Sequence, residues 1–361
     1  MQTHKKHKTV FVIGAGASFE LEMPLGSQLK TMISGKLERV SDGEGGYRNI
    51  RDHMISESVA IDCKGDATKA QRYYHAARKI ATSLELADSI DTYLSQQVEY
   101  VDRDILEALA KRAIVACILE KEAASKTSRM RKPTPFNFYP NQLNELGKGC
   151  WYTQLYALIT SGVTRSQLEG RLSRLVLVIF NYDRCLEDYL FNCLKISYDL
   201  DDAQAAACLS KIKIFHPYGK VGSLPWEIDG EPTVGYGADV SNVADLVKLS
   251  KGILTFNEVT GDDVAMYQEI SLEVKQAHQL VFLGFGFIPQ NMRLLGGNIK
   301  GNVEPDYILG TCRNLSEPDQ KSAQTQIREN ICNGSGKEIT LIDKDCVDFM
   351  NHFRLTLEGR L

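Results

Sequence analysis

The sequence predicts an α/β protein with a doubly wound, mostly parallel Rossmann-like sheet and a helical insert. Three observations support this fold class. Short apolar runs alternate with segments of helical pattern, several of these runs end in glycines or polar residues, and one long helical segment separates the first run from the others. A chain of 361 residues is long enough to form one large domain or two.

The expected strands are short and strongly apolar. The first covers residues 9–13, and the run RLVLVIFNYD has the continuous apolar pattern of a strand buried on both faces of a parallel sheet. Further strands are expected in IKIFHPYG, AHQLVFLGFGF, PDYILGTC and KEITLIDKD, and RCLEDYLFNCL is expected to form a helix. Strands separated by helices are typical of a doubly wound sheet.

A long helical segment interrupts this frame. From about residue 70 to residue 124 the pattern is helical, with neither proline nor glycine. Its apolar stripe consists of Ile90, Leu94, Val98, Val101, Ile105 and Leu109. The stretch PTPFNFYPNQ is expected to be a surface connection, and a helix is expected over residues 151–160. The chain therefore divides into a nucleotide-binding frame, residues 1–40 and 151–361, and a mostly helical insert, residues 41–150.

Composition disfavours several classes of protein. A net charge of −4 argues against a large electrostatic surface for nucleic acid. No apolar run approaches the roughly 18 residues that a membrane span needs. The nine cysteines form no C-x-x-C pair, which disfavours a zinc ribbon. Their odd number and scattered positions predict reduced thiols in a cytoplasmic protein.

The first expected strand runs into the glycine-rich turn GAGAS. Gly14 permits a tight turn, and Gly16 allows the backbone to approach a pyrophosphate at a helix N-terminus. Ser18 is suited to cap that helix or to donate to a phosphate. The dehydrogenase fingerprint needs a third glycine where this chain has Phe19, so the turn indicates a dinucleotide site outside the ordinary dehydrogenases. A purely structural turn is the alternative.

Three further motifs end expected strands. FNYD places Asn181 and Asp183 at the sheet edge where ligands of open α/β folds bind, although Asp183 is also a suitable cap for the following helix. FHPYG places His216 at the same edge, where a side chain that titrates near neutral pH can accept a proton, or can be purely structural. LGFGF places Gly284 and Gly286 there, for close approach to a ligand or for a plain turn.

In this order, the four motifs resemble the layout of the sirtuin family, and more closely the sirtuin-like domains of bacterial anti-phage defence systems. The resemblance spans about Val10 to Asp348, with the insert in the place where those domains carry one. Two features depart from protein-deacylating sirtuins. Their four-cysteine zinc module has no counterpart here, and Pro217 and Tyr218 separate His216 from Gly219, where those enzymes have histidine directly before glycine.

The resemblance implies hydrolysis of NAD+ to nicotinamide and ADP-ribose, with NAD+ as substrate and no metal. Asn181 would hold the ribose or the attacking water, and His216 would be the general base or orient the sugar hydroxyls. Asp183 would contact the nicotinamide or steady the developing positive charge. The expected pyrophosphate-binding residues are Gly14, Ala15, Gly16 and Ser18. The expected residues on the ribose and adenine side are Gly284, Gly286 and Thr311.

The resemblance also implies a cytoplasmic effector of abortive infection that does not contact nucleic acid or membrane. Sensing is expected in trans, through homo-oligomer assembly or a partner such as a HerA-type ATPase or an Argonaute-like protein. Two alternatives stay open: a non-catalytic module that senses NAD or ADP-ribose, and a sirtuin-type deacylase or ADP-ribosyltransferase. The presence of both Asn181 and His216 argues against the non-catalytic module.

Overall fold

The computed structural model contains a six-stranded, all-parallel sheet, which confirms the predicted α/β class. The structure describes residues 8–41, 47–131, 149–227, 233–240, 242–255, 261–297 and 304–359. The strand order is β5-β4-β1-β6-β7-β8. The strands are β1 (Thr9–Ile13), β4 (Leu175–Ile179), β5 (Lys213–Phe215), β6 (Gln279–Leu283), β7 (Tyr307–Thr311) and β8 (Ile339–Ile342).

The central strands are buried along their whole length. Every residue of β1, β4 and β6 is buried, because both faces of the sheet are covered by helices. β1 pairs with β4 from Thr9 opposite Leu175, and with β6 from Thr9 opposite Gln279. This in-register pairing brings the carboxyl ends of the three strands to one level, so the segments that follow them lie side by side.

Helices cover both faces of the sheet. Crossovers between parallel strands are right-handed, so connections that run toward β5 and those that run toward β8 place their helices on opposite faces. The first set comprises α9 (Trp151–Thr160), α10 (Leu168–Leu172), α11 (Cys185–Tyr198) and α12 (Asp202–Leu209), with α17 (Cys346–His352) and α18 (Arg354–Glu358) packed on α9. The second set comprises α14 (Gly261–Lys275), α15 (Pro289–Gly296) and α16 (Glu317–Asn330).

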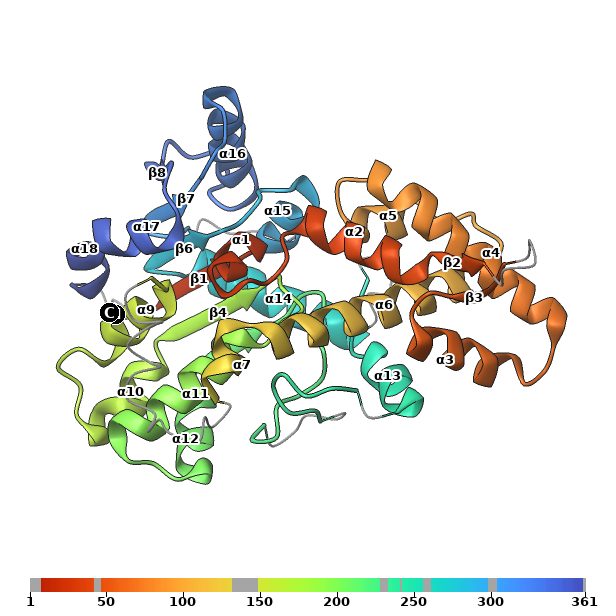
Figure 1. Cartoon of the computed structure of the whole chain (residues 1–361). Helices are drawn as coiled ribbons and strands as arrows, with labels where there is room; N and C mark the ends of the chain where they lie inside the picture. The colour runs from red at the N-terminus through yellow and green to blue at the C-terminus, as the bar shows by residue number, and fades with distance from the viewer. Residues whose placement is uncertain are drawn as a thin grey trace.

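A helical lobe extends from the sheet, on the right in Figure 1. It is built from α2 (Gly26–Leu37), β2 (Arg39–Ser41), β3 (Tyr47–Ile50), α3 (His53–Cys63), α4 (Ala67–Ser83), α5 (Ile90–Ser95), α6 (Arg103–Ala124) and α13 (Val243–Ser250). α2 and α13 lie outside the predicted insert range 41–150 but pack against α6 and its neighbours. The predicted surface connection, residues 133–142, lies outside the described residues.

The lobe does not contain the single helical stripe that the sequence predicts over residues 70–124. The chain leaves helical geometry between α4 and α5 and again between α5 and α6. Ser89 caps α5 by accepting from the Thr92 N–H at 3.0 Å. Val98 and Val101 are 57% and 90% exposed, so the prediction that they share a buried stripe with Leu109 is wrong. Their spacing fits a helix, but the turns at residues 96–102 rotate them into solvent.

A buried ion pair fastens the lobe to the sheet domain. Glu122, near the end of α6, and Arg184, just after β4, are both 0% exposed, with Nη2 2.5 Å from Oε2 and Nε 3.2 Å from Oε1. The Arg184 backbone N–H also donates to Glu122, at 3.0 Å. Arg184 Nη1 donates to the carbonyl of Val234 at 2.6 Å. Longer hydrogen bonds of 3.3–3.5 Å to the carbonyls of Ser223 and Gly235 and from the Gly237 N–H complete the shell of this pair. Together these bonds compensate the cost of removing two charges from water.

We expect Glu122→Ala to destabilise the protein by about 3–5 kcal/mol, because the Arg184 guanidinium would be left buried without a counter-charge. The measurement is the free energy of unfolding from urea titration. The matched control is Glu38→Ala, which breaks the exposed Glu38–Arg51 pair and should cost at most about 1 kcal/mol. Equal losses in the two variants would contradict the anchoring role of Glu122.

None of the described helices has the length and apolar character that crossing a membrane requires.

Candidate functional site

A cavity of about 620 Å³ lies at the carboxyl ends of the strands, which is within the size range of small-molecule and cofactor sites. Segments that follow every strand of the main sheet contribute to its wall. They include Gly14, Ala15 and Gly16 after β1, Asn181 and Asp183 after β4, Tyr218 after β5, Gly284 and Gly286 after β6, Thr311 and Arg313 at and after the end of β7, and Lys344 after β8. Eight of the ten predicted site residues therefore lie on one cavity; Ser18 and His216 are set behind its wall.

The two glycine turns pack directly on each other. Gly14 N–H donates to the carbonyl of Leu283, and Gly16 N–H donates to the carbonyl of Gly284, each at 3.0 Å. A Cβ on Gly14 would lie 2.6 Å from the Gly284 oxygen, and a Cβ on Gly284 would lie 2.0 Å from the Ala17 nitrogen. The turns need glycine for contact with each other, in addition to the ligand approach that the sequence predicts.

Gly286 differs from these glycines. A Cβ there would meet just one atom within 4 Å, Ile288 Cγ1 at 3.8 Å, and Gly286 lines the cavity. Packing within the described residues therefore does not require glycine at this position, and its missing side chain keeps the cavity wall open. Thr311 supports the same turn from β7, since its Oγ1 accepts from the Gly284 N–H at 2.9 Å.

Asn181 is held in place by the GAGAS turn. Its Nδ2 donates to Ser18 Oγ at 2.9 Å and to the carbonyl of Gly14 at 3.3 Å. Its Oδ1 is buried and has no hydrogen-bond partner among the described residues, although the side chain lines the cavity. An unsatisfied buried acceptor costs free energy, so a donor supplied by a ligand or a water fits this position. Ser18 thus supports Asn181 from behind the wall.

Asp183 occupies the floor of the same site. Its Oδ1 accepts from the N–H of Cys185, the first residue of α11, at 3.1 Å, while the N-cap position of this helix is occupied by Arg184. Ser18 Oγ donates to the same oxygen at 3.5 Å. The pKa of Asp183 is raised to about 6, mainly by burial and in part by the neighbouring carboxylates of Glu122 and Glu187.

His216 lies beneath the site. Its Nε2 is 2.7 Å from Glu187 Oε1, and its Nδ1 is 3.1 Å from the backbone oxygen of Asn181. Burial opposes the ionised form of Glu187, but the charges of His216 and Lys220 outweigh it and hold the pKa of Glu187 below its usual value. With these two contacts, both ring nitrogens of His216 have partners within the protein, and the imidazole contacts Asn181 through the main chain.

Several residues of the wall were not predicted as site residues, among them Asp91, Tyr218 and Glu20. Asp91 comes from the lobe, and its Oδ1 accepts from the Tyr182 hydroxyl at 3.0 Å. Tyr218 stands directly before Gly219, and its hydroxyl donates to Asn291 Oδ1 at 2.6 Å. Glu20 lines the cavity near the GAGAS turn, and burial raises its pKa to about 7. The spacing from Gly219 was a sequence signal for Tyr218, whereas Asp91 lies in a segment with no motif.

The end of the cavity next to β7 and β8 is polar and is lined by cationic side chains. Arg313 and Lys344 line it after β7 and β8, together with Asp345, whose Oδ2 is 3.7 Å from Arg313 Nη1. The described residues contain no group of three or more His, Cys, Asp or Glu side chains that could hold a metal ion.

Neither a family model nor a curated protein sequence matches this chain.

The two glycine positions should respond differently to alanine. Gly284 has φ +55° and a blocked Cβ position, so Gly284→Ala should lower the free energy of unfolding by about 2 kcal/mol or more. Gly286→Ala should leave stability within about 0.5 kcal/mol and weaken binding of a dinucleotide. Urea titration and calorimetric titration with ADP-ribose measure the two effects. Full ADP-ribose affinity in folded Gly286→Ala would argue against a ligand beside this residue.

The buried Asp183 carboxyl gives a pH-dependent stability. Its folded-state pKa of about 6 lies above the value of about 3.9 for an unfolded chain, so its contribution to stability is full below pH 4 and is lost as pH rises through 6. Asn at this position does not titrate. Relative to wild type, Asp183→Asn should gain about 2–3 kcal/mol between pH 4 and pH 7.5.

Chemical denaturation at the two pH values measures this difference. Asp88→Asn, a change at an exposed carboxyl, is the matched control and should show none of the gain. A gain that is equal at both pH values would contradict the raised pKa of Asp183.

Proposed function

We propose that this protein hydrolyses NAD+ at the bond between nicotinamide and ribose. One observation carries the proposal: the two facing glycine turns and the unpartnered Asn181 Oδ1 lie on a single cavity at the carboxyl edge of a parallel sheet. Ligands of open α/β sheets bind at this edge. The sirtuin-like order of the motifs supplies the reaction, and the cavity size suits a dinucleotide.

The chain's own groups suit this reaction. Water adds to C1′ of the ribose, the electron pair of the C1′–N bond leaves with nicotinamide, and one proton is released. Asn181 Oδ1 is available to accept a hydrogen bond from the ribose or the water, which positions the reacting atoms. With a pKa of about 6, Asp183 is largely ionised at pH 7.5 and opposes the positive charge that develops on the sugar.

His216 acts as a positioning residue in this proposal. It reaches Asn181 through the backbone oxygen and is itself held by Glu187. The sequence predicts His216 as the general base or as a group that orients the sugar hydroxyls. In this proposal its role is instead to fix the strand end that carries Asn181. The anti-phage role implied by the resemblance depends on the same reaction.

A second candidate function is binding of NAD+ or ADP-ribose without turnover. The observation in its favour is that His216 lies behind the cavity wall, with both nitrogens engaged in the protein. Incubation with NAD+ and chromatography of the products separates the two functions. Release of nicotinamide and ADP-ribose supports the hydrolase, and tight binding with intact NAD+ supports the module.

We expect Asn181→Ala to lower the rate of nicotinamide release at least about 100-fold, because it removes the acceptor that would position the ribose or water. His216→Ala should lower the rate about tenfold, through loss of the contact to the Asn181 backbone. The measurement is chromatography of nicotinamide formed from NAD+, with thermal unfolding to confirm that each variant is folded.

Asn192→Ala, on the outer part of α11, is the matched control and should retain the wild-type rate. Wild-type turnover in folded Asn181→Ala would reject the assignment of Asn181.

A further inference from the structure

The cavity has a direction that follows from the strand order. β4 and β8 are four strand spacings apart, about 19 Å at the usual spacing of about 4.8 Å. The glycine turns after β1 and β6 lie between them. A dinucleotide with its pyrophosphate at the glycine turns would therefore place one nucleoside toward β4 and β5 and the other toward β7 and β8.

The two ends differ in charge. The cationic side chains among the described lining residues, Arg313 and Lys344, lie at the β7–β8 end, together with the carboxyl of Asp345, which lies 3.7 Å from Arg313. The β4 end carries the carboxyls of Asp91 and Asp183. NAD+ has a positive charge on its nicotinamide ring and negative charges on its pyrophosphate. This distribution favours the nicotinamide at the β4 end.

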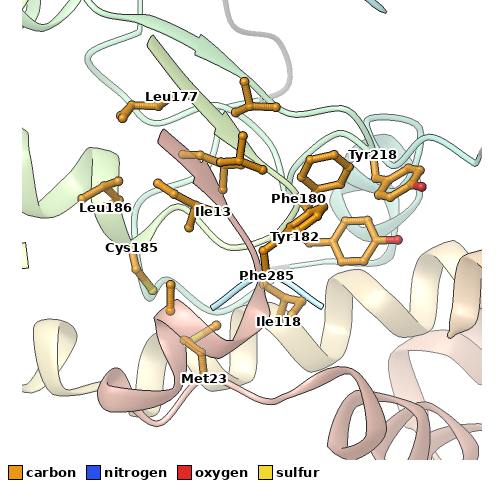
Figure 2. Packing of buried hydrophobic residues seen from close by; sticks show 14 of the residues in the cluster. Ile13, Met23, Ile118, Leu177, Phe180, Tyr182, Cys185, Leu186, Tyr218 and Phe285 are labelled. Atoms are coloured by element: carbon orange, nitrogen blue, oxygen red, sulfur yellow. The ribbon is translucent and has the colours of Figure 1, made fainter. Parts of the chain in front are cut away.

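Aromatic rings also line the cavity at this end. Phe180 lies 5.1 Å from Phe285 and 5.8 Å from Tyr218 between ring centroids, and all three line the cavity with Tyr182. Figure 2 shows these four side chains as one group, with the two tyrosine hydroxyls directed to the same side. Aromatic faces attract cations through the charge distribution of their π-systems.

We propose that Asp91, supplied by the helical lobe, is the residue that selects the cationic nicotinamide ring of oxidised dinucleotides over its neutral reduced form. The proposal rests on the proposed function. The Tyr182 hydroxyl donates to Asp91 Oδ1 at 3.0 Å, which fixes the carboxylate against the aromatic group. The nicotinamide ring would lie over these aromatic faces with its positive charge near Asp91, a favourable electrostatic interaction in a partly desolvated wall.

An unpartnered acceptor points to a polar ligand at this end. Asn181 is 7% exposed, lines the cavity, and its Oδ1 has no partner among the described residues. Gln290 also lines the cavity, beside Tyr218. One acceptor is therefore available for a hydroxyl or carboxamide N–H group of a nicotinamide riboside.

Calorimetric titration of the full chain at pH 8 tests this role with three ligands that the proposed reaction does not consume. They are ADP-ribose, NADH, and a carbocyclic NAD+ analogue in which a methylene replaces the nicotinamide-ribose ring oxygen. We expect Asp91→Asn to weaken binding of the cationic analogue about tenfold and to leave NADH and ADP-ribose within twofold. Asp88→Asn, which alters an exposed carboxyl of the same segment, should change none of the three affinities.

The ligand pattern distinguishes the outcomes. An equal loss for all three ligands in Asp91→Asn means a structural role for Asp91 and overturns the proposal, as does unchanged affinity for the cationic analogue. If wild-type protein binds none of the three ligands, the proposed function itself fails. Retained ADP-ribose affinity in Asp91→Asn also shows that the variant is folded with its cavity intact.

Discussion

The buried Glu122–Arg184 pair is the interaction on which the arrangement of the cavity depends. Glu122 lies near the end of the longest helix of the lobe, and Arg184 directly follows Asp183 at the end of β4. The same guanidinium binds the carbonyl of Val234 in the loop after β5. Because neither charge has access to water, each partner holds the other at a fixed place. The lobe, the loop and the floor of the site are thereby positioned together.

The site itself is assembled mainly from backbone packing. The turns at Gly14 and Gly284 touch through main-chain atoms, and the Asn181 amide spans from β4 to the first of these turns. His216 and Ser18 support Asn181 from behind. Asn181 is therefore placed in part by Ser18 and His216, which do not line the cavity. Such support restricts the reactive geometry without occupying the space a ligand needs.

Much of the fold could be predicted from the sequence because the strands are buried on both faces. Runs such as Leu175–Ile179 are shorter than a typical helix and rich in β-branched residues, which favours strands. The motifs after parallel strands then meet at one sheet edge. The break after α5 was missed because Val98 and Val101 keep helical spacing in a turn. The sequence places His216 at the strand end but does not reveal which way its ring points. In the structure the ring contacts Glu187, behind the cavity wall.

Because the helical lobe and the sheet domain both contribute to the cavity wall, the lobe cannot be exchanged independently of the sheet domain. In many α/β proteins an insert can be removed or exchanged because the sheet already encloses its own site. Here Ile90, Asp91 and Ile118 of the lobe close the cavity, and α6 delivers the carboxylate that neutralises Arg184. Without the lobe, the sheet domain would have an open groove in place of the cavity, and the buried Arg184 would lack its counter-charge. The lobe and the sheet domain are therefore expected to evolve together. A substitution on one side of their contact limits which residues are tolerated on the other side.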